Sequence, residues 1–462
     1  MDSHHGTARD TYRLIVTRRN ATEILLRPCA GGWRLPSVEI PRGLRIAEQL
    51  GAELRTQYGF CGYCLLVPSL AAGLEGWAVM EVPSPHGTAS KESSWKPRDA
   101  ATYSSITAAE DRTLVSKSIE ELSSHQRKPT EAPFAKPGCL AELFAWAKPQ
   151  LDPLGVRLTD AFAQLNAAAS STLIRLETNE SAVWFKAAGE PNRHELAVTT
   201  CLARLFPGCL PELLGVHAVW NGWLMRETHG STLDLCSDAS CWFRTAGELA
   251  RLQIQSAGKQ TELLDAGCLD LRLPRLTDEV EPFVDRMRRL MAAQEKESPA
   301  PLMDRELTFL RDCLQQACSR LLELDLPVTL GHIDLNPGNI VVSTERCVFL
   351  DWAEACVTNP LVTFEYLREH FRRNFPDDRT GVGDLIAAYV APWQSFVSLD
   401  DLKQAVLFSP LVAVFAYAVA AGIRRSTEPC GESLEGAYLR SLARRMFREA
   451  GQIVERSEPC LA

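Results

Sequence analysis

The segment GHIDLNPGNIVVSTERCVFLDWAE, residues 331–354, places oxygen-bearing side chains at a fixed spacing. Asp334 and Asn339 precede a β-branched run, and Asp351 follows the next apolar run. Carboxylate and amide oxygens suit Mg²⁺, which usually shares its coordination shell with water and substrate phosphates. A nearby carboxylate can also accept or orient the proton of a hydroxyl that attacks a γ-phosphoryl group. The segment therefore predicts metal-assisted phosphoryl transfer, with Asp334 directed at the hydroxyl.

The same segment predicts a hairpin that would bring two of these groups together. Ile340–Val342 and Cys347–Leu350 are strand-like, and the polar turn STER separates them. Folding the hairpin about Glu345 puts Asn339 opposite Asp351, so that both side chains converge on one cation. A polar hairpin held by Asx-turns is the alternative. The matched positions, each with a chemical task, favour an active-site loop.

A lysine on a strand and a glutamate on the next helix form a second candidate site. The segment SAVWFKAAGEPNRHELAVTTCLARLFP, residues 181–207, has a strand that ends near Lys186 and a helix that carries Glu195. This layout fits a lysine that pairs with α- and β-phosphate oxygens while the glutamate fixes its rotamer. An unpaired ammonium on a buried strand would be costly. An exposed, ordinary strand lysine is the alternative.

A turn of small residues lies upstream of this lysine. The segment LNAAASSTLIRLE, residues 165–177, is predicted to form strand, turn and strand, without the G-x-G-x-x-G of protein kinases. Small side chains and the hydroxyls of Ser170, Ser171 and Thr172 could let the backbone approach a phosphate. A plain hairpin turn fits the sequence equally well.

The central loop resembles the signature of the aminoglycoside phosphotransferase and choline kinase-like family, a relative of the protein kinases. The resemblance is carried by His332-x-Asp334-x4-Asn339 and, twelve residues later, by Asp351-Trp352-x-Glu354. It implies that Asp334 is the catalytic aspartate, that Asn339 and Asp351 bind magnesium, and that His332 supports the loop.

The resemblance extends to a connector between lobes and has departures. GWLMRETHGSTL, residues 222–233, resembles the family's lobe connector, where backbone groups from Met225 to Glu227 would hydrogen-bond the adenine of ATP. The chain has Ile333 where the family usually has glycine and Asn336 where it often has histidine. The family's later aspartate is not evident in NPLVTFEYL.

The beginning of the chain resembles a Nudix hydrolase that has lost its metal ligands. The W-x-L-P entry, an amphipathic helix and a closing Gly59-Phe60 occur within residues 31–60. Of the helix carboxylates Glu53 remains, while Leu44, Thr56 and Gln57 replace glutamates, and one carboxylate cannot assemble a multi-metal site. We predict an inactive Nudix-like domain that acts as scaffold, dimerisation surface or ligand sensor. An unrelated small α/β domain and a working hydrolase are the alternatives.

The order of patterns predicts an α+β protein: a bilobal protein kinase-like fold preceded by the α/β Nudix-like domain. The predicted parts are a Nudix-like domain at 1–125, a Pro- and Ser-rich linker at 126–138, a strand-rich small lobe at 139–230 and a helical lobe at 231–462. We expect helices near 45–57, 108–122, 140–146 and 193–205, and strands near 161–186 and 213–227. The charged run EYLREHFRRNFPDD is expected to be a solvated helix face.

Composition excludes some function classes. A net charge of −9 argues against a nucleic-acid binder. The N-terminus lacks the apolar core of a signal peptide, and fifteen cysteines without such a signal indicate reduced thiols and a cytoplasmic protein. The apolar run from Val406 to Ile423 is expected to be a buried helix with Pro410 near its first turn, not a membrane span.

The resulting hypothesis is an ATP- and Mg²⁺-dependent kinase that phosphorylates a hydroxyl of a small molecule such as an alcohol, sugar or aminoglycoside-like aminocyclitol. The sequence does not identify the acceptor or the oligomeric state, for which a homodimer is one option. The alternative hypothesis is a nucleotide-sensing pseudokinase joined to a non-catalytic Nudix-like domain.

Overall fold

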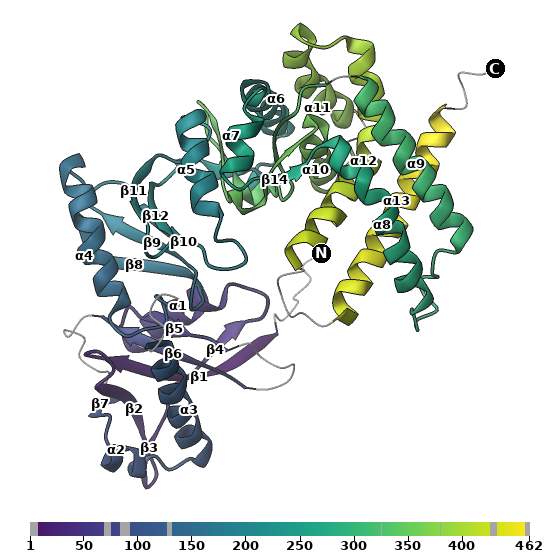
Figure 1. The fold of residues 1–462 in the computed structure, drawn as a ribbon. Coiled ribbons are helices and arrows are strands. Elements are labelled where there is room, and N and C mark those ends of the chain that lie inside the picture. Colours follow the sequence, from purple (N-terminus) through teal and green to yellow (C-terminus); the bar gives the residue numbers. More distant parts are fainter. Residues whose placement is uncertain are drawn as a thin grey trace. The chain divides into compact units, whose positions relative to one another are not determined.

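The computed structural model describes residues 8–68, 75–83, 93–126, 132–324, 326–378, 380–425 and 432–457. Its contacts divide the chain into two compact units. The first contains Met1–Leu196 and Glu212–Glu227, and the second contains Ala197–Pro211 and Thr228–Ala462. The first unit is rich in strands and the second is mainly helical (Figure 1). The α+β class predicted from the sequence is confirmed.

The first unit begins with a seven-stranded sheet whose main path has the order β3-β2-β1-β6-β5, with β4 paired to β1 and β7 paired to β2. β1 is parallel to β6 and antiparallel to β2 and β4. The elements of this part are β1 (Arg9–Arg18), β2 (Glu23–Cys29), β3 (Gly32–Arg34), β4 (Ser37–Pro41), α1 (Ile46–Tyr58), β5 (Tyr63–Leu66), β6 (Gly76–Val82), β7 (Ser94–Pro97), α2 (Ala100–Ser105) and α3 (Ala109–Gln126).

Successive residues of β1 pack into different cores, as the alternation of side chains along a strand requires. Leu14 and Val16 pack in one cluster with Leu50 of α1. Ile15 belongs to a second cluster together with Val115 of α3. Helices α1 and α3 therefore cover opposite faces of this sheet.

The second sheet of the first unit has five antiparallel strands in the order β11-β12-β10-β9-β8. Its elements are α4 (Cys139–Leu151), η1 (Asp152–Leu154), β8 (Leu158–Ala167), β9 (Thr172–Thr178), β10 (Val183–Ala187), β11 (Leu213–His217) and β12 (Gly222–Arg226). Helix α5 (Glu195–Leu205) begins in the first unit and continues into the second. Figure 1 shows α4 beside this sheet.

The two sheets of the first unit share one hydrophobic core. Trp77 of β6, Phe162 of β8 and Phe185 of β10 belong to the same buried cluster. Within the predicted linker, residues 132–138 are described, and Phe134 is buried in this cluster with 3% of its surface exposed. The segment after residue 131 is therefore packed against both sheets.

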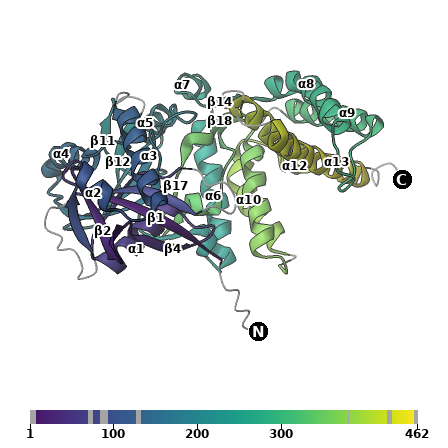
Figure 2. The same cartoon turned by 90° about the horizontal axis from the view of Figure 1, so that it is seen from below.

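The second unit is built around long helices and two small sheets, with strand orders β13-β16-β17 and β14-β18-β15. Its elements are β13 (Ser231–Thr232), η2 (Leu233–Leu235), α6 (Ala239–Ser256), α7 (Gln260–Asp265), β14 (Leu269–Leu271), α8 (Leu273–Ala292), α9 (Asp304–Glu323), β15 (Thr329–His332), η3 (Pro337–Asn339), β16 (Ile340–Val342), β17 (Cys347–Phe349), η4 (Trp352–Glu354), β18 (Ala355–Thr358), α10 (Pro360–Asn374), α11 (Gly381–Val390), η5 (Ala391–Ser395), α12 (Leu399–Arg425) and α13 (Glu432–Ser457). Helices α8, α9, α12 and α13 lie side by side (Figures 1 and 2).

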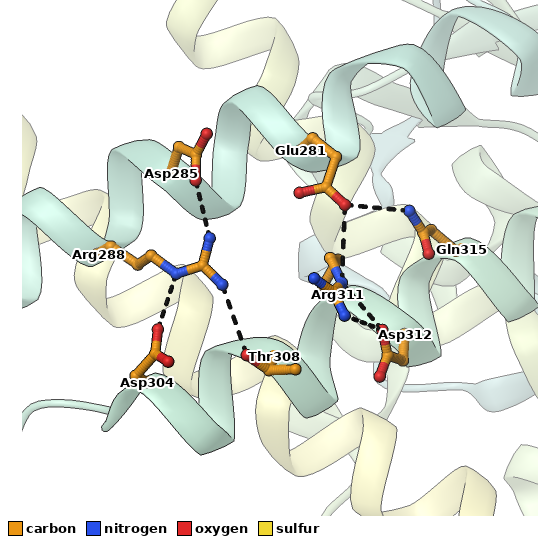
Figure 3. Close-up of polar contacts among 8 residues, drawn as sticks. All are labelled: Glu281, Asp285, Arg288, Asp304, Thr308, Arg311, Asp312 and Gln315. Atoms are coloured by element: carbon orange, nitrogen blue, oxygen red, sulfur yellow. Dashed lines mark hydrogen bonds and ion pairs between the residues drawn. The ribbon is translucent and has the colours of Figure 1, made fainter.

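Two arginines cross-link α8 and α9 (Figure 3). Arg288 of α8 contacts Asp304 at 2.8 Å, in the first turn of α9. Arg311 of α9 lies 3.6 Å from Glu281 of α8. Because these side chains are partly exposed, we attribute the stability of the pair to its apolar contacts and not to these ions.

Helix α12 differs from expectation at its start. The helix begins at Leu399, so Pro410 lies well inside it and not near its first turn. Among the described residues, Leu399–Ile423 is the one helix long and apolar enough to cross a membrane, and 61% of its most apolar window is buried within the protein. That burial is typical of the core helix of a folded domain, and one such helix is weak evidence for a membrane span.

The described cysteines are free thiols used in packing. The thirteen cysteines in the described ranges form no disulfide. Cys61 and Cys64 form a C-x-x-C sequence, and burial raises the pKa of Cys64 to about 12. The group therefore stays protonated at neutral pH, where a metal ligand or a redox thiolate would have to lose its proton.

Candidate active site

The central loop is anchored by a buried histidine. His332 ends β15 with 1% of its surface exposed, and its Nδ1 accepts a hydrogen bond from the Asp334 backbone N–H at 3.2 Å. Since Nδ1 is an acceptor, Nε2 carries the proton and donates it to the Leu350 carbonyl at 3.2 Å. Burial lowers the pKa of His332, which keeps the ring neutral. The ring therefore joins the start of the loop to the end of β17.

The loop turns tightly after Asp334. The backbone N–H of Asn336 donates to the Asp334 carbonyl at 2.7 Å, and the Asn336 side chain accepts from Gly338 N–H at 3.1 Å. The side-chain amide of Asn339 donates to the same Asp334 carbonyl at 3.3 Å. These bonds fix the backbone of the loop, while the Asp334 side chain is exposed. The loop therefore holds the backbone of Asp334 and leaves its carboxylate accessible.

The hairpin forms as predicted, but its register differs by one residue. Val342 pairs with Cys347 and Ile340 pairs with Phe349, so the hairpin is centred between Thr344 and Glu345. The expectation that Asn339 lies opposite Asp351 is therefore wrong. Asn339 lies opposite Leu350, whose N–H donates to the Asn339 carbonyl at 2.8 Å.

Asp351 follows this last pair in a backbone conformation that is unusual for a residue other than glycine. Its φ is 61° and its ψ is 62°, in the left-handed region. The next residue, Trp352, is buried and donates from Nε1 to the Phe349 carbonyl at 3.1 Å, which fixes the bend. Strained conformations of this kind cluster at functional sites, where surrounding structure holds them.

The residues of this loop fit a magnesium ion that is shared with a phosphorylated substrate. In the described ranges no group of three or more His, Cys, Asp or Glu could hold a metal by itself. Asn339 and Asp351 would supply one amide and one carboxylate oxygen, and Mg²⁺ commonly takes its other ligands from water and phosphate. The Asn339 amide nitrogen is engaged with the loop, so its oxygen is the atom left for a cation.

In the first unit, the structure pairs Lys186 with Glu195. Lys186 lies on β10 between β9 and β12, and its Nζ is 2.5 Å from Glu195 Oε1 at the start of α5. The side chains are 19% and 3% exposed. The expectation of an ordinary exposed strand lysine is therefore not met. The carboxylate holds the ammonium at a fixed place in the sheet.

The small-residue turn closes the β8–β9 hairpin close to the end of β10. Ala168 N–H donates to the Ser171 carbonyl at 3.0 Å. Ser170 packs on Gly189, where a built Cβ would come within 2.1 Å of its Oγ. Glycine at 189 therefore lets this turn approach the segment that follows Lys186.

The connector after β12 offers fewer free backbone groups than the sequence suggested. Met225 lies on a strand that is paired on both sides, with Trp184 and with Leu213. The N–H of Glu227 donates to the Ala182 carbonyl at 3.2 Å, and its carboxylate binds Arg175 at 2.8 Å. Adenine recognition at Met225 and Glu227 stays a prediction.

A cavity of about 260 Å³ lies beside Asp334. Within the second unit, α10, α12 and α13 each present one helix face to it, at spacings of three, four and seven residues. The lining residues include Asp334, Asn336, Glu365, Tyr366, Glu369, His370, Arg372, Arg373, Pro410, Ala413, Val414, Tyr417, Tyr438, Leu442, Arg445 and Glu449.

The expectation that EYLREHFRRNFPDD is a solvated face is wrong for its first half. Glu365 and Arg368 are buried, and Tyr366, Glu369 and His370 line the cavity. The helical spacing of Glu365, Glu369 and Arg372 was a readable signal for one shared face, but the sequence did not show that this face is covered.

Comparison with known proteins finds a family match for part of the chain. The sequence model described as "Phosphotransferase enzyme family" matches residues 193–393. No curated protein matches the chain. Ethanolamine kinase of Plasmodium vivax is a similar solved structure, with 14% identity, a TM-score of 0.44, and coverage of 65% of this chain and 85% of that one.

Two further solved structures show the same level of similarity. Choline kinase of Cryptosporidium parvum has 10% identity and a TM-score of 0.46, covering 69% of this chain and 96% of that one. Macrolide 2'-phosphotransferase type I has 17% identity and a TM-score of 0.42, covering 64% of this chain and 96% of that one. The segment that matches the family model contains Asp334, Asn339 and Asp351. The match shows that residues 193–393 are similar to the phosphotransferase enzyme family.

Proposed function

We propose that this protein transfers the γ-phosphate of ATP, with magnesium, to a hydroxyl of a small molecule. The observation that carries the proposal is the anchored loop beside a cavity. His332 accepts a hydrogen bond from the Asp334 backbone N–H, and Asn339 donates one to the Asp334 carbonyl, so that Asp334 is held in place. The family match supports phosphoryl transfer as the reaction class. A nucleotide and a divalent ion, when bound, supply the phosphoryl group and neutralise its developing charge.

The chemical role of each group follows from its position in the loop. The acceptor oxygen forms a bond to the γ-phosphorus as the bond from phosphorus to the β–γ bridging oxygen breaks, and ADP leaves. The acceptor proton passes to the carboxylate of Asp334. Asn339 and Asp351 would hold the metal, and neutral His332 maintains the loop without taking the proton.

We assign nucleotide phosphate binding to Lys186, with Glu195 as the group that fixes it, and a backbone contribution to the turn at Ser170 and Ser171. Phosphate binding needs an ammonium group held at a fixed place. The ion pair with Glu195 holds the Lys186 ammonium and offsets the cost of its partial burial. Met225 and Glu227 are the proposed adenine contacts. We place the activity in the cytosol, in keeping with the free cysteines of the described ranges.

The experiment that tests this function compares Asp334→Asn with Asp278→Asn, an exposed carboxylate on α8. Phosphate transfer from ATP is measured over a panel of hydroxylated compounds, with nucleotide binding measured by calorimetry. We expect Asp334→Asn to lower transfer by about 10²–10⁴-fold, the usual contribution of a general base, and to leave nucleotide affinity within about twofold. Asp278→Asn should behave as the native protein.

Unchanged transfer in Asp334→Asn would refute the assignment of Asp334. Tight nucleotide binding by the native protein with no transfer to any acceptor would instead identify a nucleotide sensor.

A further inference from the structure

We propose that the cavity beside Asp334 binds a hydroxylated acceptor that also carries an anionic group, a carboxylate or a phosphate. This inference depends on the proposed function, because it treats the cavity as the acceptor site of that reaction. It concerns the class of acceptor, which neither the family match nor the loop specifies.

The first observation is an excess of guanidinium groups around one carboxylate. Arg373 binds Glu369 Oε1 at 2.9 Å, and Arg445 and Arg372 approach Oε2 of the same residue at 3.6 and 4.0 Å. Of these three contacts to Glu369, the one from Arg373 is at hydrogen-bond distance. The long contacts of Arg372 and Arg445 leave donors for a second anion.

The second observation is that another carboxylate of the cavity is already neutralised. Glu365 binds Arg368 at 2.6 Å, with side-chain exposures of 8% and 5%, and Ser409 Oγ donates to it at 2.6 Å. An arginine partner and a hydroxyl donor occupy it, so it offers little attraction to a cationic acceptor. The other charged residues that line the cavity are Asp334, Glu369, Glu449, Arg372, Arg373 and Arg445. Arg372 and Arg445 are the two guanidiniums among them with only long printed contacts to a carboxylate.

The histidine of the cavity does not change this balance. Burial, with the nearby charge of Arg373, lowers the pKa of His370. The ring is therefore neutral at neutral pH and can exchange hydrogen bonds with hydroxyls in either direction.

The third observation is a set of aromatic rings that can hold a carbon skeleton. Tyr417 lies 5.8 Å from Tyr366 and 6.0 Å from Tyr438, measured between ring centroids. Such rings also attract cations. Arg372 and Arg445 line the same cavity, and an anion would complete the coordination of both guanidiniums. The rings therefore fit a sugar-like or short aliphatic skeleton, and the guanidiniums fit its anionic end.

The test uses acceptors that share a skeleton and differ in charge. Glucose, glucosamine, gluconate and glucose 6-phosphate, with choline as an unrelated cation, are titrated into the native protein with a non-hydrolysable ATP analogue and Mg²⁺. Binding is measured by calorimetry, and transfer from ATP is measured in parallel. We expect gluconate or glucose 6-phosphate to bind at least about tenfold more tightly than glucosamine, which corresponds to one charge-assisted contact.

Matched variants locate the anionic subsite. Arg372→Gln and Arg445→Gln each remove a guanidinium that is partly exposed and only weakly paired, so the fold should persist. Each should weaken binding of the anionic probe about tenfold or more and raise KM more than it lowers kcat. Arg448 is exposed and lies on α13, the helix that carries Arg445, so Arg448→Gln should leave binding unchanged.

The outcomes separate this inference from the proposed function. Binding or transfer that favours glucosamine or choline would overturn the anionic acceptor without affecting the proposed kinase activity. The same conclusion would follow if Arg448→Gln weakened binding of the anionic probe as much as Arg372→Gln and Arg445→Gln do. Failure of every anionic probe to bind would also overturn it. The difference in affinity between gluconate and glucose 6-phosphate shows whether a carboxylate or a phosphate is the recognised group. If the native protein bound no ATP, that result would count against the proposed function itself.

Discussion

At the scale of single residues, the position of a reactive group is fixed by the partner that it binds, as in the pair of Lys186 and Glu195. An ammonium with 19% of its side chain exposed needs a compensating carboxylate, and Glu195 supplies it from the start of α5. If the ammonium binds phosphate, the glutamate acts by positioning it.

We therefore expect Glu195→Gln to weaken nucleotide binding about tenfold or more, because the lysine loses its fixed rotamer. The measurement is calorimetric titration with an ATP analogue. Glu212→Gln, which removes an exposed partner of Arg226 in the same unit, is the control and should bind normally. An unchanged affinity in Glu195→Gln would show that the pair is only structural.

His217 offers a test of pH dependence away from the proposed metal ligands. Its ring stacks on Trp220 with centroids 4.0 Å apart, and Nδ1 accepts from Trp220 N–H at 3.2 Å. Burial lowers its pKa below the model-compound value of 6.5. Because the folded pKa is depressed, its contribution to stability is complete above pH 6.5 and is lost as the pH falls through the folded pKa.

We expect the His217 resonance in NMR to titrate with a midpoint below 6.5, and the melting temperature to fall on acidification less steeply in His217→Phe than in the native protein. The variant supplies the assignment of the resonance. A midpoint above 6.5 would contradict the account.

At the scale of elements, α10 depends on a buried ion pair. Asn359 and Pro360 start this helix, with Asn359 Oδ1 accepting from Leu361 N–H at 3.1 Å. The helix then buries Glu365 and Arg368 against α12. Removing one member of such a pair leaves an uncompensated charge in the core.

Accordingly, Arg368→Met should destabilise the second unit by about 3–5 kcal/mol. The double variant Arg368→Met with Glu365→Gln should recover part of this loss, since no buried charge then lacks a partner. The free energy of unfolding of each variant is measured by denaturant titration, with a signal from the second unit. Equal stability of the single and double variants would contradict the ion-pair explanation.

At the scale of the whole molecule, the core of the first unit is shared between its two sheets. The side-chain amide of Gln164 on β8 accepts from the Cys64 N–H at 2.7 Å and donates to the Cys64 carbonyl at 3.2 Å. Arg55 of α1 donates to the Phe162 carbonyl at 3.1 Å. The N-terminal part thus covers β8 and satisfies its buried polar groups.

A chain that begins at Ala132 should therefore expose this core and aggregate or bind a hydrophobic dye, as followed by size-exclusion chromatography and fluorescence. Gln164→Leu in the full chain should cost about 2–3 kcal/mol, because it leaves two buried backbone groups unpaired. A truncated chain that is monomeric and binds nucleotide normally would contradict the shared core. The Nudix-like identity of residues 1–125 remains a prediction, since the family match begins at residue 193.

Sequence alone determined the features that local rules control. Periodicity placed α1, α3 and α5 within a few residues of their observed bounds, and turn chemistry predicted the β16–β17 hairpin. The polar residues of the loop from His332 to Asp351 could be recognised because their types and spacing follow the demands of one reaction.

Tertiary structure decided what depends on covering one element with another. The hairpin register shifted by one residue, so that Asn339 pairs with Leu350 and Asp351 takes the bend after the strand. The charged run on α10 became a cavity wall because α12 and α13 pack over it, and no local pattern reveals which face of a helix will be covered. Burial and pairing are properties of contacts between distant segments, and only the folded chain fixes them.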